Sequence, residues 1–403
     1  MTFANINART VSTICAIMIA IYALAFFGKS IGPEGMVLDT NSRPRLVDHL
    51  SLWTAGRLAA EGNAAGAYDR REHAGAMAEA MGYQPTSPLP FSYPPSLMLV
   101  LTPLSQQSFP VSFVLFGLLS LVPFAWVSIR IVGRPDAALW TLAMVPPFWN
   151  FCVGQTGALA AALLGAGLLL LPSRPAMAGV MLGLLTFKPH LGLLVPIALL
   201  AAGEFRAIAS AVFTTVALFL ASTAMFGMEP WLAFAASLPT FGAFALADTN
   251  LTAYKLQSIF GVLRALGVGS NVALAMQAML ALALTALTWQ LWRRPVPHAL
   301  KSAILMTSAT LATPYAFHYD LTLLTLAQAF WLRHAIERGI TTNDVMAILL
   351  MNALIMLFPQ LGLSVFVSPV VSLLGAILIV ILGFLFVTVS SRLTGEVDRK
   401  SVV

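Results

Sequence analysis

The chain has 403 residues, of which 59% are hydrophobic and only 9% are charged, and its mean hydropathy is +0.85. Soluble domains carry roughly 25% charged residues, so the composition excludes an ordinary soluble enzyme and predicts a protein that crosses a membrane many times. The formal net charge is +6, but the basic residues are scattered among short connections. No single basic surface is formed, which argues against a nucleic-acid partner.

Apolar segments long enough to cross the hydrocarbon core of a bilayer recur along the chain. The first, residues 11–31, could be a signal peptide, but it is long for one and lacks a small-x-small cleavage site. We therefore interpret it as an uncleaved span. The sequence predicts an all-α polytopic membrane protein, a bundle of about twelve transmembrane helices forming one integral membrane domain over residues 1–403. The expected spans are 11–31, 110–130, 136–150, 155–171, 176–189, 190–202, 207–227, 271–292, 300–314, 318–333, 343–359 and 368–390.

Basic residues fall in alternate short connections, which the positive-inside rule assigns to the cytoplasm. Arg9 places the N-terminus there, and an even number of spans brings the C-terminus to the same side. We expect a multi-pass protein of the plasma membrane with an outer loop at 32–95 and an outer segment at 228–270. The other basic positions are Arg130, Arg134, Arg174, Arg206, Arg293, Arg294, Lys301, Arg333, Arg338, Arg392, Arg399 and Lys400.

The outer loop contains a candidate catalytic carboxylate, Asp48. Leu46, Leu50 and Trp53 recur at helical spacing, which predicts an amphipathic helix along the membrane interface that holds Asp48 at headgroup level. A second short helix is expected over 70–81. A partly buried carboxylate there could act as a general base toward a hydroxyl. The alternative is a solvated aspartate.

Two cations lie in apolar sequence on the same predicted side. Lys188 is flanked by apolar helices, and an unpaired charge at membrane depth costs about 2.5–3.5 kcal/mol or more, so it is a functional candidate by default. Arg264 offers a planar fork that suits phosphate oxygens. The alternatives are a lysine that extends to the headgroups and an arginine that anchors at the interface.

A polar cluster follows the break at Pro314: Tyr315, His318 and Asp320. The histidine could donate to a phosphate while Asp320 orients it. Gln155, with Thr156 beside it, and Tyr93 are weaker candidates for hydrogen bonding to a sugar. The alternative role for these is capping of a helix end.

Several motifs are absent from the sequence. It has no Asp-x-Asp pair, no phosphate-binding Gly-x-x-x-x-Gly-Lys-[Ser/Thr] loop and no His-Glu-x-x-His. This disfavours an ATPase, a zinc protease and a nucleotide-sugar enzyme, and no metal or other cofactor is expected. Cys15 and Cys152 fall in or beside apolar segments and indicate no disulfide framework.

Read in order, these motifs resemble glycosyltransferase family 87, the membrane transferases that use polyprenyl-phosphate sugars. The motifs that carry the resemblance are Asp48 with Trp53, Gly56 and Leu58; Gly62 with Ala67-Tyr68-Asp69; Phe91-x-Tyr93-Pro94-Pro95; Gly154-Gln155-Thr156; Gly179-x-x-x-Gly183 before Lys188-Pro189; Gln257-Ser258-x-x-Gly261-x-x-Arg264; and Thr313-Pro314-x-x-x-His318-x-Asp320.

The resemblance implies a GT-C type fold and transfer of a hexose, mannose above all, from a polyprenyl-phosphate donor to a lipid or glycan acceptor on the outer face of the membrane. Asp48 would be the base, and Lys188, Arg264 and His318 would contact the donor phosphate. The positions expected to bind substrate are Tyr93, Gln155, Tyr315, Asp320 and Gln257. With no paired metal ligands, the expected reaction is a metal-independent inverting displacement.

Two other functions fit the composition. A flippase for lipid-linked glycans or a secondary transporter is one, although transporters usually carry repeats and ionisable residues at the membrane midplane, and this chain shows no repeat. The other is a noncatalytic assembly subunit.

Overall fold

The computed structural model describes residues 8–31, 38, 41, 44, 45, 47–85, 88–245, 256–341, 344 and 348. Helices make up most of this part of the chain, and it contains no strand, only the isolated bridges Leu38–Pro44 and Leu256–Phe317. The all-α prediction is confirmed for the described residues. The spans expected at 343–359 and 368–390 lie outside them, apart from residues 344 and 348.

The helices in chain order are α1 (Ala8–Ile31), α2 (Asp48–Ala60), α3 (Arg70–Met81), α4 (Met98–Ser105), α5 (Phe109–Val132), α6 (Ala137–Leu142), α7 (Val145–Val153), α8 (Gly157–Leu170), α9 (Pro175–Leu184), α10 (Val195–Ala202), α11 (Phe205–Phe226), α12 (Glu229–Ala245), α14 (Ile259–Ala265), α15 (Ser270–Trp292), α16 (His298–Ala312) and α17 (Thr322–Arg338). Short 3-10 segments are η2 (Ala64–Tyr68), η3 (Pro95–Leu97), η4 (Leu185–Phe187), η5 (Pro189–Gly192) and η6 (His318–Leu321).

Three described helices are long and apolar enough to cross a membrane: α5, α11 and α15. Only 6% of the α11 window is buried inside the protein, so its apolar side chains face the surroundings and suit lipid rather than water. Shorter apolar helices, such as α8 with 14 residues, span a bilayer only where protein or water covers their ends.

Prolines explain where the short helices begin. The expected span 136–150 is in fact two helices, because Pro146 and Pro147 occupy the first turn of α7 rather than a helix interior. A proline lacks the amide proton that an interior position donates to a carbonyl of the helix. In the first turn that amide has no carbonyl partner within the helix, so a proline is tolerated there. Pro175, Pro189 and Pro196 begin α9, η5 and α10 in the same way.

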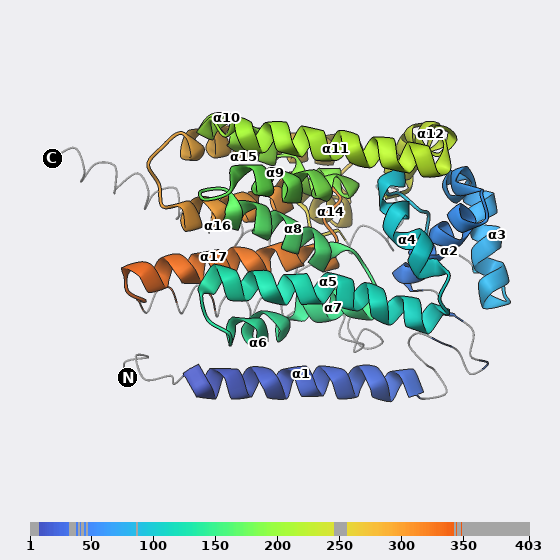
Figure 1. Cartoon of the computed structure of the whole chain (residues 1–403), viewed down its shortest axis with the longest axis horizontal. Helices are drawn as coiled ribbons and strands as arrows, with labels where there is room; N and C mark the ends of the chain where they lie inside the picture. The colour runs from blue at the N-terminus through green and yellow to red at the C-terminus, as the bar shows by residue number, and fades with distance from the viewer. Residues whose placement is uncertain are drawn as a thin grey trace.

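The long helices α1, α5, α11 and α17 run along the long axis of the molecule, and α2, α3, α4 and α12 gather at one end of it (Figure 1). The helix α5 packs against α4 near its beginning and against α6 near its end, so it links this end of the bundle to the other (Figure 1). The helix α9 packs closely on α11 because Gly179 and Gly183 leave room for it. A Cβ at Gly179 would lie 2.2 Å from the Ala207 carbonyl oxygen, and one at Gly183 would lie 2.6 Å from Thr214 Cβ.

The helix α2 differs from the sequence prediction. Ten of its thirteen residues are buried, so it packs within the protein and is not an amphipathic helix with one polar face. Leu50 and Trp53 pack near Phe109 and Phe113, while Gly56 meets α4, where a Cβ would lie 2.5 Å from the Leu101 carbonyl oxygen. The helix is buried on this second side as well, because a residue as small as Gly56 lets the backbone of α2 approach α4 closely.

The described parts of the outer segment expected at 228–270, residues 228–245 and 256–270, contain α12 and α14. α12 packs against η2, and α14 packs against α15. The short helix predicted over 70–81 is confirmed as α3. Its first turn is capped by the Asp69 carboxylate, which accepts from the amides of Arg71 and Glu72 and whose pKa is thereby lowered. Gly82, in the left-handed conformation, ends it.

Candidate active site

The centre of the site is the turn between α7 and α8, residues 154–156. Gly154 has a φ of +66°, which a residue with a side chain rarely adopts, and a Cβ there would lie 2.5 Å from His49 Cβ. Gly157 has a similar function on the other side, because a Cβ there would lie 2.1 Å from the Tyr319 carbonyl oxygen. These two glycines allow α2 and η6 to pack against the same turn.

Asn150 fixes the shape of this turn. Its backbone carbonyl accepts from the Gln155 amide at 3.0 Å, and its side-chain oxygen accepts from the Ala158 amide at 3.2 Å. Sequence reasoning did not single out this residue. A buried asparagine just before a Gly-Gln-Thr turn was the available signal, since a buried amide needs partners.

The Gln155 side chain holds Asp48. The side-chain oxygen of Gln155 accepts from the Tyr93 hydroxyl at 2.7 Å and from the Thr156 amide at 3.1 Å. Since two donors occupy this oxygen, the amide nitrogen faces the other way and donates to Asp48 Oδ2 at 3.1 Å. The orientation of Gln155 thus directs an amide donor at the Asp48 carboxylate.

Thr156 connects Gln155 and Tyr93 to a buried cation. Lys188 Nζ donates to Thr156 Oγ1 at 3.1 Å, and that hydroxyl lies 3.1 Å from the Tyr93 hydroxyl. The Tyr93 proton is already donated to Gln155, so Thr156 donates its own proton to Tyr93. This order leaves a Thr156 lone pair for Lys188.

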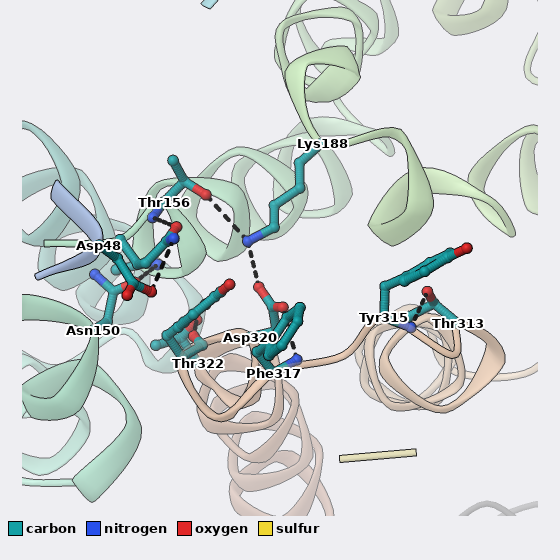
Figure 2. A network of polar contacts seen from close by, with 12 residues as sticks. Asp48, Asn150, Thr156, Lys188, Thr313, Tyr315, Phe317, Asp320 and Thr322 are labelled. Atoms are coloured by element: carbon teal, nitrogen blue, oxygen red, sulfur yellow. Dashed lines mark hydrogen bonds and ion pairs between the residues drawn. The ribbon is translucent and has the colours of Figure 1, made fainter. Parts of the chain in front are cut away.

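Lys188 forms a buried ion pair with Asp320. Its Nζ lies 2.5 Å from Asp320 Oδ1, and the side chains are 3% and 0% exposed. Lys188 also lies over the Tyr319 ring, 4.7 Å from the ring centre. The second oxygen of Asp320 accepts from the Phe317 amide at 3.0 Å, which fixes the start of η6. Figure 2 shows Asp48 and Asp320 at opposite ends of this network, with Thr156 and Lys188 between them.

His318 lies against Gln257, a partner that the sequence did not predict, and the role of Asp320 in orienting His318 stays a prediction. His318 Nε2 lies 3.0 Å from Gln257 Nε2, and the Gln257 backbone amide donates to the Ala316 carbonyl at 2.6 Å. The segment before α14 therefore lies against the segment before η6. The hydrogen bonds of Asp320 are with Lys188 and with the Phe317 amide.

Arg264 and Tyr315 lie apart from the network around Asp48. Arg264 Nη1 donates to the Val268 carbonyl oxygen at 2.5 Å, at the end of its own helix. The Tyr315 ring packs between His190 and Phe241, with centroid distances of 6.4 Å to each. Of the residues predicted for the site, the network brings together Asp48, Tyr93, Gln155, Lys188 and Asp320. Gln257 contacts His318, which lies two residues before Asp320.

Comparison with known proteins identifies the family. The family model described as "Glycosyltransferase family 87" matches residues 91–314, which is more than half of the 403 residues.

The chain belongs to glycosyltransferase family 87.

The family resemblance inferred from the motifs is confirmed, and the protein is a membrane glycosyltransferase. Comparison with curated proteins and with solved structures gave no match. The matched residues include Tyr93, Gln155 and Lys188, whereas Asp48 and Asp320 lie outside them. The contacts of Asp48 with Gln155 and of Asp320 with Lys188 join both carboxylates to the part of the chain that matches the family.

Proposed function

We propose that this glycosyltransferase moves a hexose, most specifically mannose, from a polyprenyl-phosphate donor to a lipid or glycan acceptor on the outer face of the plasma membrane. The observation that carries the proposal is the network in which a carboxylate, Asp48, and a buried cation, Lys188, are held by the same turn. An inverting transfer needs a base on one side of the anomeric carbon and a stabilised leaving phosphate on the other.

Asp48 is a better base than Asp320. Asp320 is fully buried, and its oxygens are occupied by Lys188 and by the Phe317 amide. An acceptor hydroxyl cannot reach a carboxylate that is 0% exposed. Asp48 is only half-buried, so an acceptor hydroxyl can approach it, and the neutral Gln155 amide donates to one of its oxygens.

Lys188 is the main candidate to bind the donor phosphate. A phosphate oxygen would replace Asp320 or share the ammonium with it, because Lys188 carries three donors and two of them point at Thr156 and Asp320. His318, at the start of the same η6 segment, would add a donor. Arg264, whose Nη1 donates to the Val268 carbonyl oxygen, would be a further contact.

The proposed reaction is a single displacement. The acceptor hydroxyl oxygen attacks the anomeric carbon while Asp48 takes the hydroxyl proton. The bond from that carbon to the phosphate oxygen breaks, its electron pair stays on the phosphate, and polyprenyl phosphate leaves. The configuration at the anomeric carbon inverts. Lys188 and His318 stabilise the charge that develops on the phosphate.

The outward orientation rests on charge. Arg293, Arg294 and Lys301 lie at the connection between α15 and α16, and Arg206 lies at the start of α11, whose other end leads to α12. Positively charged connections favour the cytoplasm, so the end of the bundle with α2 and α12 faces outward.

Purified protein tests this function with two labelled donors. Polyprenyl-phosphate mannose should give a new glycosidic product, and GDP-mannose should give none. Lipid-linked mannose that crosses a proteoliposome membrane without formation of a new bond would instead indicate a flippase and contradict the proposal.

A further inference from the structure

A cavity of about 350 Å³ lies between α12 and the outer-loop elements η2 and α3. Its volume is at the lower end of the range for small-molecule sites, roughly 300–1,000 Å³, and suits a headgroup rather than a long chain. Three aromatic rings line it, those of Tyr68, Phe91 and Phe241. Polar groups from Arg70, Ser237 and Thr240 complete the lining.

The polar groups of this cavity differ in what they can still bind. The Asp69 carboxylate caps α3, and His73 Nε2 lies 3.1 Å from the Ser51 carbonyl oxygen, so both have structural partners. Ser237 donates its proton to the Phe234 carbonyl at 2.8 Å, which leaves its oxygen lone pairs to accept from a ligand hydroxyl. The exposed Thr240 hydroxyl both donates and accepts.

Aromatic faces beside hydroxyl and guanidinium groups suit one class of ligand. A sugar or polyol ring has an apolar face of C–H bonds, which packs on an aromatic ring, and an edge of hydroxyl groups that need polar partners. A purely apolar ligand would form no hydrogen bond with the Ser237 oxygen or the Thr240 hydroxyl.

The cavity shares a wall with the Asp48 site. The Tyr68 hydroxyl donates to the Tyr93 carbonyl oxygen at 2.8 Å, and the Phe91 and Tyr93 rings lie 5.8 Å apart. The Tyr93 hydroxyl in turn donates to Gln155, the residue that holds Asp48. The segment 91–93 therefore lines the cavity at one residue and touches the Asp48 network two residues later.

We propose that this cavity binds the sugar or polyol headgroup of the acceptor, so that a hydroxyl reaches Asp48 past Tyr93. The inference rests on the proposed function, since it assigns the second substrate of the same transfer. Lys188, which binds the donor phosphate in that proposal, is linked through Thr156 to the Tyr93 hydroxyl, whereas Tyr68 contacts the Tyr93 carbonyl oxygen. The donor and the acceptor headgroup therefore meet different atoms around Tyr93.

The test fills the cavity without touching the Asp48 network. Ala236→Trp places a large ring in the cavity from α12, and Leu232→Trp is the matched control, because Leu232 is 64% exposed on the same helix and does not line the cavity. Thr240→Val removes one hydroxyl with little change of shape. The acceptor probe is n-octyl α-mannoside, the donor-side probe is polyprenyl phosphate, and the detergent has no sugar headgroup.

Ala236→Trp should raise the KM for octyl mannoside by about ten-fold or more, while the affinity for polyprenyl phosphate stays within about two-fold of the original value. Thr240→Val should raise the same KM by about two- to ten-fold, the cost of one hydrogen bond. Leu232→Trp should change neither. An unchanged KM in Ala236→Trp, or equal changes in Ala236→Trp and Leu232→Trp, would overturn the assignment.

If the unmodified protein transfers no sugar at all, the proposed function fails. Binding of octyl mannoside then tests whether the cavity is a sugar site. Octyl mannoside should then raise the melting temperature of the unmodified protein and not that of Ala236→Trp. Absence of binding by the unmodified protein would refute the cavity assignment.

Discussion

The buried ion pair between Lys188 and Asp320 gives the most informative mutational prediction. Both side chains are almost fully inaccessible, 3% and 0% exposed, so Lys188→Met would leave the Asp320 carboxylate in a low-dielectric interior without its cation. Removal of one partner from such a pair costs about 3–5 kcal/mol. Replacement of both partners, as in Lys188→Met with Asp320→Asn, is far less costly, because no unpaired charge remains buried.

This loss of stability corresponds to a measurable decrease in the melting temperature. The entropy of unfolding scales with chain length at about 2.1 cal/mol/K per residue, so for a chain of 403 residues 3–5 kcal/mol corresponds to about 4–6 °C. Lys188→Met alone should melt lower by about that amount in detergent, and the double variant should recover most of the loss. Both variants should lose binding of polyprenyl phosphate, because both lack the ammonium group.

Stability and ligand binding separate in this experiment. A double variant that recovers stability and also binds polyprenyl phosphate as tightly as the original protein would refute the assignment of Lys188 as a phosphate contact. A single variant as stable as the original protein would refute the energetic reasoning about the ion pair.

Three further predictions concern the scaffold of the site. His73 is buried beside α2, and burial lowers its pKa from 6.5 to about 4. As pH falls below 6.5 the unfolded chain therefore protonates this histidine before the folded protein does, and His73 alone should remove about 2 kcal/mol of stability between pH 7.5 and 5. His73→Gln should reduce the pH dependence of the melting temperature by that share. Gly157→Ala forces a Cβ to within 2.1 Å of the Tyr319 carbonyl oxygen and should cost about 1–3 kcal/mol, whereas Gly192→Ala, where the nearest atom lies 3.8 Å away, should be close to neutral; equal melting temperatures for the two would contradict this packing. Asp69→Ala removes the cap of α3 and should cost about 1 kcal/mol, while Asp69→Asn, which can still accept from both amides, should lose less in the same thermal assay.

Local signals in the sequence were sufficient to predict some elements. The helix over 70–81 was predictable because a capping aspartate precedes it and a glycine follows it. The start and end of α5 were also close to the expected span, since a long apolar run ends at Gly133, which adopts a left-handed conformation.

The packing of α2 was not predictable from its apolar pattern. Leu50 and Trp53 mark one apolar face, which suggests an interfacial helix, but small residues such as Ala55 and Gly56 bury the opposite face against α4. The spacing of large hydrophobic residues does not reveal a helix face whose small side chains allow close packing. The prediction that Asp48 lies at the headgroups on an amphipathic helix was therefore wrong about the packing of α2.

The partners of the site residues also escaped sequence reasoning. Lys188 and Asp320 were each singled out, but they lie 132 positions apart, and nothing in the sequence pairs them. The pairing of Lys188 with Asp320 depends on how η6 packs against the turn at Gly157. Arg264, by contrast, donates to a carbonyl only four residues away, and its proposed contact with the donor phosphate remains a prediction.

The central claim is that Asp48 is the base for glycosyl transfer, and the single-turnover rate of Asp48→Asn tests it most directly. Asparagine keeps the shape of the side chain and leaves Lys188 in place, so binding of polyprenyl phosphate should not change, while the rate of transfer from polyprenyl-phosphate mannose should fall by about 10²–10⁴-fold, the usual contribution of a general base. A rate within a few-fold of that of the unmodified protein would contradict the role assigned to Asp48.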